Sequence, residues 1–540
     1  MTEDQLSGDY GKHLVGEVLN GRMTRRQLLV RASIMGLSVG TIGSLLAACG
    51  SGSSSSSVTP SSAALSPTPG GRLRVGTAFG GPTDTLDPGK VVSAVDDYRA
   101  YNLFDALAYF DPQLNCKLLL AESMEPNSDA TVWTIRLRSG VTWSDGKPLT
   151  AADVMYTLRR NQKLQLVGLY ATLAIDFTKL KQLDPLTIQV PLNTPRADFN
   201  FDLADISIVQ DGATSFTHPV GTGPFQFVSW TPGQTSLFKK NPNYFLTGQP
   251  YLDELEISTI SDPSARLNAL LAGQVDAIDQ VTFASARQYK HTTKFQLLQS
   301  PSGSYIPFTM RCDAAPFNDV RVRQAMRLIP DRQALVNVAQ FGFGQVGNDL
   351  AGMGEPDYNT QLPQRAQDLA QAKSLLKAAG HEGLAITVNT STVSPGMLES
   401  ATAFAQQAQG AGVKVTINNI PAANYYGPQY LKYVFGMSGW VALPVVEVMA
   451  GALAQGAPFN ETHWNNKQFN SLYTQARATL DSAKRQEMLF EAQKILWNEG
   501  GYLIWGFLPY LDAVTNKVHT PPTSAVLPLC NAMFREFWVA

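Results

Sequence analysis

The residue with the clearest chemistry in this sequence is Cys49, because a cysteine sulfur can carry a covalently attached lipid. Cys49 ends the run Leu46-Ala47-Ala48-Cys49, which follows a basic cluster at 24–31 and a weakly apolar stretch at 32–48. Basic, then apolar, then small residues is the order of an export signal that ends at a cleavage site. The apolar stretch contains Gly36, Gly40 and Gly43, so the alternative of a short transmembrane anchor is disfavoured, since a span needs about 20 strongly apolar residues.

The run 46–49 resembles a bacterial lipobox, in which the cysteine is acylated and becomes the mature N-terminus. Arg25-Arg26 followed by Gln27-Leu28-Leu29 resembles a twin-arginine signal, although the sequence does not decide between this export route and the general secretory one. Residues 49–71 are rich in Gly, Ser and Pro, a composition typical of a flexible tether. We therefore expect residues 1–48 to be an export signal and the mature protein to be lipid-anchored on the outer side of a membrane, in the periplasm or at the cell surface.

Composition places the rest of the chain among large globular proteins. The chain has 540 residues, of which 44% are hydrophobic and 16% charged, and even without the first 48 it is too long for a single core. The formal net charge is −2, which disfavours nucleic acid as a partner, because nucleic-acid binding requires a basic face.

The remaining chemical motifs favour neither an enzyme nor a metalloprotein. Cys116, Cys312 and Cys530 allow one disulfide at most, and the sequence leaves open whether it forms. No Cys-x-x-Cys, His-x-x-x-His, Gly-x-Ser-x-Gly or His-Glu-x-x-His spacing occurs, so we predict no catalytic residue, metal site or cofactor. The Gly-x-Gly-x-x-Gly match at 342–347 follows a helical segment instead of a strand, which is typical of a loop and not of a nucleotide site.

Helix and strand signals alternate along the chain and predict an α/β fold. Trp133, Ile135 and Leu137 alternate with polar residues as in a half-buried strand, and Thr150 with Asp153 forms a capping box. The expected strands are 133–137, 186–190 and 413–417, and the expected helices are 150–160, 262–271, 319–328, 369–379 and 484–498.

Several blocks in sequence order resemble the solute-binding proteins of peptide/nickel-type ABC importers, family 5. They are Leu86-Asp87-Pro88 and the stretches 118–125, 133–150, 220–225, 241–244, 316–325 and 372–380. The resemblance implies an α/β, two-lobed periplasmic-binding-protein-like fold of the large type II cluster, with an extra third domain. It implies lobe I at 72–104, 196–272 and 506–540, the extra domain at 105–195, and lobe II at 273–505.

The family resemblance also implies where a ligand would bind. The stretch 435–444 is similar to the family's Gly-Trp-x-x-Asp segment, whose Asp pairs with a peptide's α-ammonium, but Leu443 occupies that position here. A leucine cannot neutralise an ammonium group, so capture of a free peptide N-terminus is in doubt, and we leave open whether Glu447 substitutes. Trp440 is the strongest candidate for stacking on a ligand, with a plain core role as the alternative.

Other candidate ligand-binding residues follow from the same resemblance. Backbone groups of Gly439, Val441, Gly303, Ser304 and Tyr305 would hydrogen-bond an extended ligand, while Asn460 and His463 would contact it or hold a loop. Thr85 and Tyr510 are weaker candidates, and for Tyr425 and Tyr426 packing or surface roles are favoured.

The resemblance predicts a monomeric receptor that closes by a hinge on a peptide-like or other small organic ligand and passes it to the permease subunits of an ABC importer. Two alternatives remain open from the sequence: a secreted lipoprotein enzyme such as a hydrolase, and a sensory or chaperone-like lipoprotein that binds without transport. The sequence does not give the ligand's identity, length or charge.

Overall fold

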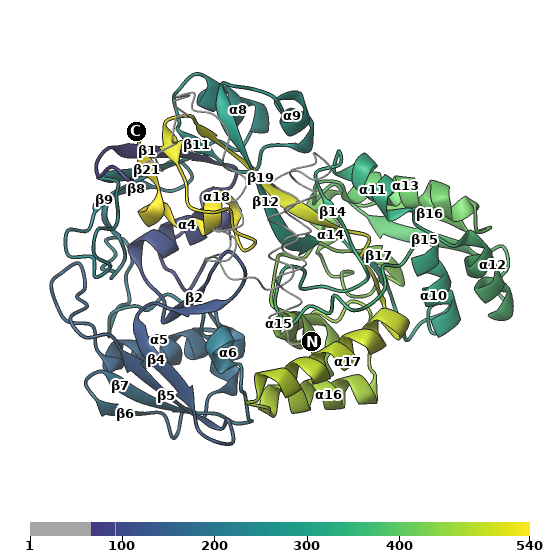
Figure 1. Ribbon diagram of the computed structural model, residues 1–540, viewed down its shortest axis with the longest axis horizontal. Coiled ribbons are helices and arrows are strands. Elements are labelled where there is room, and N and C mark those ends of the chain that lie inside the picture. The colour runs from purple at the N-terminus through teal and green to yellow at the C-terminus, as the bar shows by residue number, and fades with distance from the viewer. Residues whose placement is uncertain (1–65, 92) are drawn as a thin grey trace, which may run out of the picture. The chain divides into compact units, whose positions relative to one another are not determined.

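The computed structural model describes residues 66–91 and 93–540. The predicted export signal at 1–48, Cys49 and the predicted tether up to residue 65 lie outside the described residues. From Pro67 onward the chain forms one compact unit, built mainly on two mixed sheets and one antiparallel sheet, which are flanked by helices (Figure 1). Within the described residues, every helix is too short or too polar to cross a membrane.

The largest sheet takes strands from both ends of the chain. Its order is β12-β19-β11-β1-β10-β9-β8, with β14 paired to β19. Strand β1 runs parallel to β10 and β11, and the other pairs are antiparallel. The strands are β1 (Arg72–Thr77), β8 (Phe225–Thr231), β9 (Thr235–Lys240), β10 (Glu254–Thr259), β11 (Ala277–Ile278), β12 (Phe295–Tyr305), β14 (Gln345–Val346) and β19 (Gly506–Thr515).

The core of this sheet lies beneath α4 and the C-terminal segment. Leu73, Val75 and Ile257 are buried on it together with Phe534 and Phe537 from the chain's end. The helices and short strands that accompany the sheet are α4 (Ala94–Leu103), α8 (Pro263–Leu271), α9 (Phe283–Gln288), β20 (Val518–His519), α18 (Pro528–Asn531), the 3₁₀ turn η2 (Phe534–Glu536) and β21 (Trp538–Val539).

A four-stranded antiparallel sheet with its own core follows α4. Trp133, Ile135 and Leu137 face that core as their alternation predicts, and Asp153 accepts the backbone N–H of Thr150 at 2.7 Å, as a capping residue should. The elements are β2 (Ala108–Phe110), β3 (Cys116–Leu118), β4 (Ala121–Pro126), β5 (Val132–Leu137), α5 (Ala151–Leu164), α6 (Leu169–Ala174), β6 (Lys181–Asp184), β7 (Thr187–Pro191) and α7 (Phe199–Asp202); the sheet order is β4-β5-β7-β6.

The second half of the chain forms a five-stranded sheet in the order β16-β15-β17-β13-β18. Its strands are β13 (Phe308–Met310), β15 (Ala385–Thr390), β16 (Lys414–Asn419), β17 (Phe435–Met437) and β18 (Tyr502–Leu503). Its helices are α10 (Val320–Leu328), α11 (Arg332–Ala339), α12 (Leu369–Ala378), α13 (Met397–Gln409), α14 (Ala422–Tyr425), α15 (Val445–Val448), the π-helical η1 (Met449–Leu453), α16 (Lys467–Ala478) and α17 (Ser482–Glu499).

The predicted strands and helices are confirmed to within a few residues, because local signals determined their ends. Asp262 accepts the N–H of Ala265 at 2.7 Å and starts α8. Asp481 accepts from Ala483 and Lys484 at 3.1 Å and starts α17, which ends at Glu499 before two glycines. Such caps satisfy backbone donors that the first turn of a helix leaves free.

The Gly-x-Gly-x-x-Gly segment is a tightly packed connection that contains β14. A Cβ atom on Gly344 would lie 1.4 Å from the side chain of Gln340, and one on Gly347 would lie 2.4 Å from the carbonyl oxygen of Ile504. These glycines therefore allow close packing of the chain and do not form a phosphate loop. Cys116, Cys312 and Cys530 are all free thiols.

Two neighbouring chain crossings connect the large sheet to the five-stranded sheet. The chain leaves β12 at Tyr305 and enters β13 at Phe308, and it leaves β18 at Leu503 and enters β19 at Gly506. Because β12 pairs with β19 and β13 pairs with β18, the two crossings run side by side. The domain boundaries expected from the sequence stay a prediction.

Candidate functional site

Trp440 and Tyr305, which the sequence separates by more than a hundred residues, form a backbone bridge. The N–H of Tyr305 donates to the carbonyl of Trp440 at 3.0 Å, and the N–H of Trp440 donates back at 2.9 Å. Their rings are nearly parallel, with centroids 6.5 Å apart and an angle of 9°. The bridge joins the end of β12 to the segment after β17, so it brings the predicted stretches 303–305 and 439–441 together.

A buried carboxylate, Glu461, holds the indole of Trp440. Its Oε2 accepts the Trp440 Nε1–H at 3.4 Å and the Tyr502 hydroxyl at 2.8 Å. Its Oε1 accepts the Ser438 hydroxyl at 2.5 Å and also the hydroxyl of Tyr430. All four partners are donors, so they fix both the carboxylate and the orientation of the indole.

Burial and hydrogen bonding act on Glu461 in opposite directions. Burial raises the pKa of its carboxyl group, whereas the hydrogen bonds from Ser438, Tyr430, Tyr502 and Trp440 lower it, and the net direction is upward. Burial of an acid with only hydroxyl and indole partners explains this direction, since no cation compensates the charge.

The segment around Trp440 contains three further candidate residues, Gly439, Val441 and Leu443, and their surroundings differ. The Gly439 N–H already donates to the Tyr426 hydroxyl at 3.1 Å, and a Cβ there would lie 2.9 Å from Ser394 Oγ. Val441 is 58% exposed, while Leu443 packs on the apolar cluster around α15 and α17. Val441 is therefore the most accessible residue of this segment, and Leu443 is part of the packing beneath it.

Gly303, Ser304 and Tyr510 lie together where the pairing of β12 with β19 is interrupted. The register shifts between Ser300 and Ser304, and Ser304 Oγ lies 3.0 Å from the Tyr510 hydroxyl. A Cβ on Gly303 would lie 3.0 Å from the carbonyl oxygen of Met353. The bulge thus places a backbone segment and a hydroxyl pair beside the two chain crossings.

Asn460, His463 and Thr85 are occupied by local contacts. Asn460 binds the backbone of Trp464 through both side-chain atoms, at 2.8 and 3.0 Å. The His463 ring nitrogens lie 2.9 Å from Asp313 and 2.9 Å from the carbonyl of Leu431. Thr85 Oγ1 accepts the N–H of Asp87 at 3.0 Å. These contacts fit the alternative of loop-holding roles.

Tyr425 and Tyr426 have different roles although they are adjacent. Tyr425 is buried and its hydroxyl donates to the carbonyl of Met437 at 2.6 Å, as a packing residue would. Tyr426 is 43% exposed and receives the Gly439 N–H, so it lies beside the Trp440 segment.

Glu447, the residue considered as a substitute for the missing Asp, lies on α15 and is half-buried. It makes no hydrogen bond or ion pair with the residues that the structure describes. Burial raises its pKa to about 8, and the carboxylates of Asp202, Asp205 and Asp198 add to this effect while Arg477 opposes it. Glu447 is therefore an acid without a bonded partner in a region of excess negative charge.

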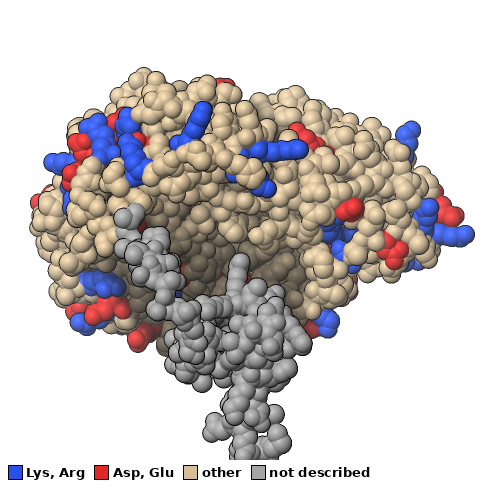
Figure 2. Space-filling view, turned by 45° about the horizontal axis from the view of Figure 1, so that its top comes forward, with Lys and Arg blue, Asp and Glu red and all other residues tan. Residues whose placement is uncertain are grey.

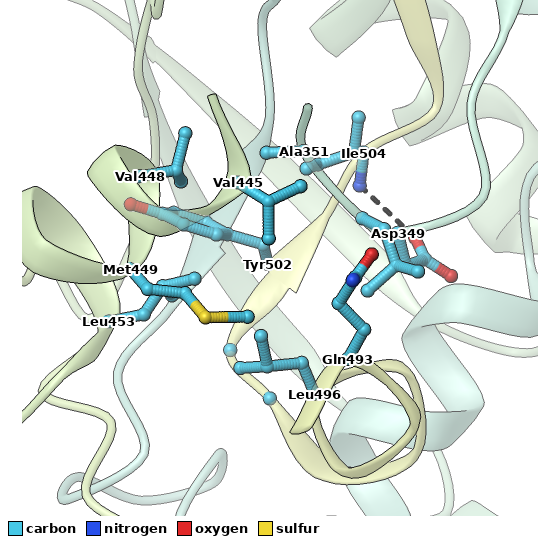
Figure 3. A pocket seen from close by; sticks show the side chains of 13 residues that line it. Asp349, Ala351, Val445, Val448, Met449, Leu453, Gln493, Leu496, Tyr502 and Ile504 are labelled. Carbon is cyan, nitrogen blue, oxygen red and sulfur yellow. Dashed lines mark hydrogen bonds between the residues drawn. The ribbon is translucent and has the colours of Figure 1, made fainter. Parts of the chain in front are cut away.

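A small apolar cavity lies behind the Trp440 segment. Figure 3 shows it between Val445, Met449 and Leu453 on one side and Leu496 of α17 on the other, with Asp349 accepting the backbone N–H of Ile504 at 3.1 Å. Its volume of about 20 Å³ is of the order of a single water molecule. This cavity belongs to the packing of α15, η1 and α17 and is too small for an organic solute.

The outer surface carries charges of both signs. On the face in Figure 2, Lys and Arg side chains lie beside Asp and Glu side chains near the edges, and uncharged surface lies between them. The part of this face that the picture shows uncovered therefore has no extended basic area such as nucleic acid requires.

Glu461, Asp97, Asp205 and Arg477 are candidate functional residues that sequence reasoning missed. Glu461 lies inside the stretch 458–464, which the sequence did single out, but only its neighbours Asn460 and His463 attracted attention. Asp97, Asp205 and Arg477 carry no local motif, because what distinguishes them is their position against distant segments.

Comparison with known proteins identifies the family. Residues 115–455 match the model of the bacterial extracellular solute-binding proteins, family 5 (middle). The glutathione-binding protein GsiB of Pectobacterium atrosepticum is 26% identical over 479 residues, which cover 83% of this chain and 90% of that protein.

Solved structures of similar fold cover slightly more of the chain than this relative does. The periplasmic binding protein DppA of Helicobacter pylori, in complex with the peptide STSA, superposes with a TM-score of 0.72 at 22% identity, over 87% of this chain and 98% of that one. The PBP AgaA of A. tumefaciens R10, in complex with agropinic acid, gives 0.71 at 24% identity, over 87% and 99%. The fold is thus the α/β, two-lobed fold expected from the sequence.

Proposed function

Because this chain belongs to family 5 of the bacterial extracellular solute-binding proteins, we propose that it is a lipid-anchored receptor that closes on a small organic ligand and delivers it to an ABC importer. Proteins of this family are binding proteins of ABC importers and not enzymes, so the protein binds its solute without changing it. The proposal includes three specific features: a lipid anchor on Cys49, closure of the two lobes by a hinge, and a defined ligand site.

The pair of neighbouring crossings between the two larger sheets is the observation that carries the proposal. Two short connections, Tyr305 to Phe308 and Leu503 to Gly506, are the covalent links of β12 and β19 to the five-stranded sheet. Links of this length can act as a hinge by small changes of backbone angle. On the expected boundaries, lobe I is 72–104, 196–272 and 506–540, lobe II is 273–505, and 105–195 is the extra domain.

Trp440 and its neighbours form the proposed ligand surface. Trp440 is partly buried and fixed by Glu461, while Val441 is exposed beside it and Tyr426 lies next to Gly439. A fixed aromatic ring contributes contact area at low cost in conformational entropy. Backbone groups at Gly303, Ser304 and Tyr305 border the same bridge, so an extended ligand would lie along the segment from Tyr305 to Val441.

The ligand of this receptor need not be that of its relatives. Glutathione, a peptide and agropinic acid occur in the names of the similar proteins, and Leu443 occupies the position of the family's ammonium-binding Asp. We propose a peptide-like or other small organic solute that is not held through an acid at position 443.

Native mass spectrometry of the mature protein, followed by small-angle scattering with and without the released solute, tests the receptor function. We expect a co-purified small molecule of unchanged mass and a smaller radius of gyration when it is added back. A protein that carries no solute and does not contract with any solute offered, or a guest whose mass changes on incubation, would overturn the proposal.

The lipid anchor is tested separately with Cys49→Ser. We expect the wild-type protein to partition with membranes and the variant to be released into the soluble fraction, because acyl chains on Cys49 supply the attachment. Metabolic labelling with a fatty acid should mark the wild type alone. Continued membrane association of the unlabelled variant would contradict the anchor and leave the binding function untouched.

A further inference from the structure

A small cavity lined by both apolar and polar residues lies between α4, the segment after it and the C-terminal turn. Its lining includes Tyr101, Asp105, Tyr109, Asp205, Asn531 and Arg535. In Figure 1, α4 and α18 lie near one another, and the Asn102 side chain donates to the carbonyl of Ala532 at 3.0 Å. The volume is about 30 Å³, room for roughly one or two groups of the size of a water molecule or an ammonium.

Asn531 supplies a free acceptor to this cavity. Its side chain is 2% exposed, its Nδ2 donates to the carbonyl of Phe110 at 3.5 Å, and its Oδ1 has no hydrogen-bond partner among the described residues. A buried amide oxygen without a partner costs on the order of 1–3 kcal/mol. A donor placed in the cavity would remove that cost.

The backbone that presents Asn531 is itself unusual. Leu529, Cys530, Asn531 and Ala532 all have positive φ, between 50° and 62°, so a left-handed turn of four side-chain-bearing residues covers most of α18 and its C-cap. Each such residue costs about 1–2 kcal/mol relative to the right-handed form. A conformation of this cost is retained where the surrounding structure enforces it, often at a functional site.

Two carboxylates beside the cavity form no ion pair with the residues that the structure describes. Asp205 lines the cavity and receives only a backbone hydrogen bond, from Phe110, while Asp97 lies one helical turn before Tyr101 on the same face of α4. Within the described residues, neither Asp97 nor the Tyr101 hydroxyl has a hydrogen-bond or ion-pair partner. Burial raises the pKa of both acids to about 7. Asp96 adds to the effect on Asp97, and Asp97 adds to that on Asp205, where the Phe110 hydrogen bond and the charge of Arg535 act in the opposite direction.

Arg535 is the one cation that lines the cavity in the described structure, and other acids already compensate it. Its Nε lies 3.5 Å from a Glu536 carboxylate oxygen, its guanidinium lies over the Tyr109 ring at 5.4 Å, and Asp105 acts on it electrostatically. Asp105 is also held by the hydroxyls of Thr222 and Tyr244, both at 3.1 Å. Neither Asp205 nor Asp97 forms an ion pair with a described cation, and Arg535 acts on Asp205 only through its charge.

Glu447 extends this negative charge into the second half of the chain. It lies on α15, and its electrostatic neighbours include Asp205 as well as Asp202 and Asp198. Arg477, which could compensate it, is already bound to Asp198 and Asp202 at 3.0–3.1 Å. The excess of acid therefore runs from α4 past Asp205 to α15, where the two halves of the proposed receptor face each other.

We infer that Asp205, Asp97 and the free Oδ1 of Asn531 form a site for the cationic head group of the transported solute, an ammonium or a guanidinium. This inference rests on the proposed receptor function and specifies its ligand class. The carboxylates of Asp205 and Asp97 and the Oδ1 of Asn531 are all acceptors, so a cation with several N–H donors satisfies the three at once, while Arg535 Nε is a buried donor without a hydrogen-bond partner at the same cavity. The acids of this site would neutralise the positive charge of the solute, which Leu443 cannot do.

The test measures the affinity of the refolded, cargo-free mature protein by calorimetry for the tripeptides Arg-Gly-Gly and Glu-Gly-Gly, both N-acetylated so that no N-terminal ammonium is present, and for spermidine. We expect the cationic probes to bind and Glu-Gly-Gly to bind at least tenfold more weakly.

Asp205→Asn should weaken binding of the cationic probes about tenfold or more, which corresponds to about 1.4 kcal/mol. Asn tolerates the positive φ of 60° at this position, so the variant keeps the backbone. Asp211→Asn, an exposed acid of the same segment, is the matched control and should change affinity less than twofold.

Proton release gives a second readout that a purely structural role would not produce. Acids with a pKa of about 7 are partly protonated at pH 7, so a bound cation displaces protons, and the observed enthalpy should vary with the ionisation enthalpy of the buffer. Asp205→Asn should reduce that release.

Equal affinity for Glu-Gly-Gly, an unaffected Asp205→Asn variant, or a cavity filled by water alone in a complex would overturn the inference. Such results together with closure on a neutral or anionic solute would leave the receptor function standing. Failure to bind any solute would instead contradict the receptor function itself.

Discussion

Arg477 on α16 binds Asp198 through two hydrogen bonds to the same oxygen, from Nε at 3.1 Å and from Nη2 at 3.0 Å. The same guanidinium donates to both oxygens of Asp202, and the carbonyl of Arg477 accepts the N–H of Ala197 at 2.6 Å. On the proposed boundaries, 198–202 belongs to lobe I and Arg477 to lobe II. The contact therefore fastens the two lobes at a distance from the two chain crossings.

Replacement of Arg477 by methionine should favour the open form. The substitution leaves Asp198 buried without its bonded cation, while Asp202 keeps its ion pair with Arg196; loss of one partner of a buried pair costs about 3–5 kcal/mol. We expect weaker ligand affinity and a larger radius of gyration by small-angle scattering, with a cooperative melting transition retained. Arg136→Met is the control, since Arg136 pairs with Glu122 at an exposed position and should change stability by about 1 kcal/mol or less. Unchanged scattering and affinity in Arg477→Met would show that the contact does not set the closed state.

Trp440→Ala should weaken ligand binding roughly tenfold to a hundredfold and leave folding nearly intact. The ring is partly buried and its contacts with Tyr305 and Phe459 lie at centroid distances of 6.5 and 6.3 Å, so its loss opens little of the core, whereas a stacked ligand would lose an aromatic contact. Calorimetric titration and thermal melting measure the two effects. Trp440→Phe keeps a ring but loses the bond to Glu461, so it should lie between the wild type and the alanine variant. Wild-type affinity in Trp440→Ala would remove this residue from the site.

Sequence reasoning was strongest where a local signal determines the structure. The alternation of Trp133, Ile135 and Leu137 predicted a strand because side chains alternate across a sheet, and Asp262 marked a helix start because a carboxylate caps free N–H groups. The family blocks then predicted the fold, since they occur in order along most of the chain.

The site was less accessible to sequence reasoning because its partners are distant in the chain. Asp205 and Asn531 line one cavity although more than three hundred residues separate them, and the free oxygen of Asn531 follows from a left-handed turn that no motif announces. Trp440 was found through its motif. Glu461, which orients Trp440, lies beside it only after folding.

Glu461→Gln should destabilise the protein by about 1–3 kcal/mol. Both oxygens of Glu461 accept hydrogen bonds from donors, and a glutamine amide would turn one acceptor into a donor that faces another donor, leaving buried groups unpaired. Chemical denaturation measures the loss, and the altered setting of Trp440 should change its fluorescence. Glu382→Gln is the control, because Glu382 is exposed and only loosely paired with Lys377 at 3.7 Å. Equal stability of both variants would mean that the Glu461 network contributes nothing to the fold.

The ligand-free protein should lose stability as the pH rises from about 5 to above 8. Burial raises the pKa of Glu447 from 4.5 to about 8, with Asp202, Asp205 and Asp198 contributing and Arg477 opposing. A raised carboxyl pKa means that the folded state holds a proton that the unfolded state has released. The corresponding stabilisation is complete below the unfolded pKa and is lost as the pH rises through the folded one. Asp97 and Asp205, with pKa values of about 7, act in the same direction.

Urea denaturation at several pH values between 5 and 9 measures how the free energy of unfolding depends on pH. Glu447→Gln should flatten the curve and be more stable than the wild type at pH 8.5, because the amide carries no charge to bury, while the exposed Glu382→Gln should follow the wild-type curve. A saturating cationic ligand should also flatten the wild-type curve, since it compensates the same carboxylates. A wild-type stability that rises across this range would contradict the assignment of these acids as buried and uncompensated.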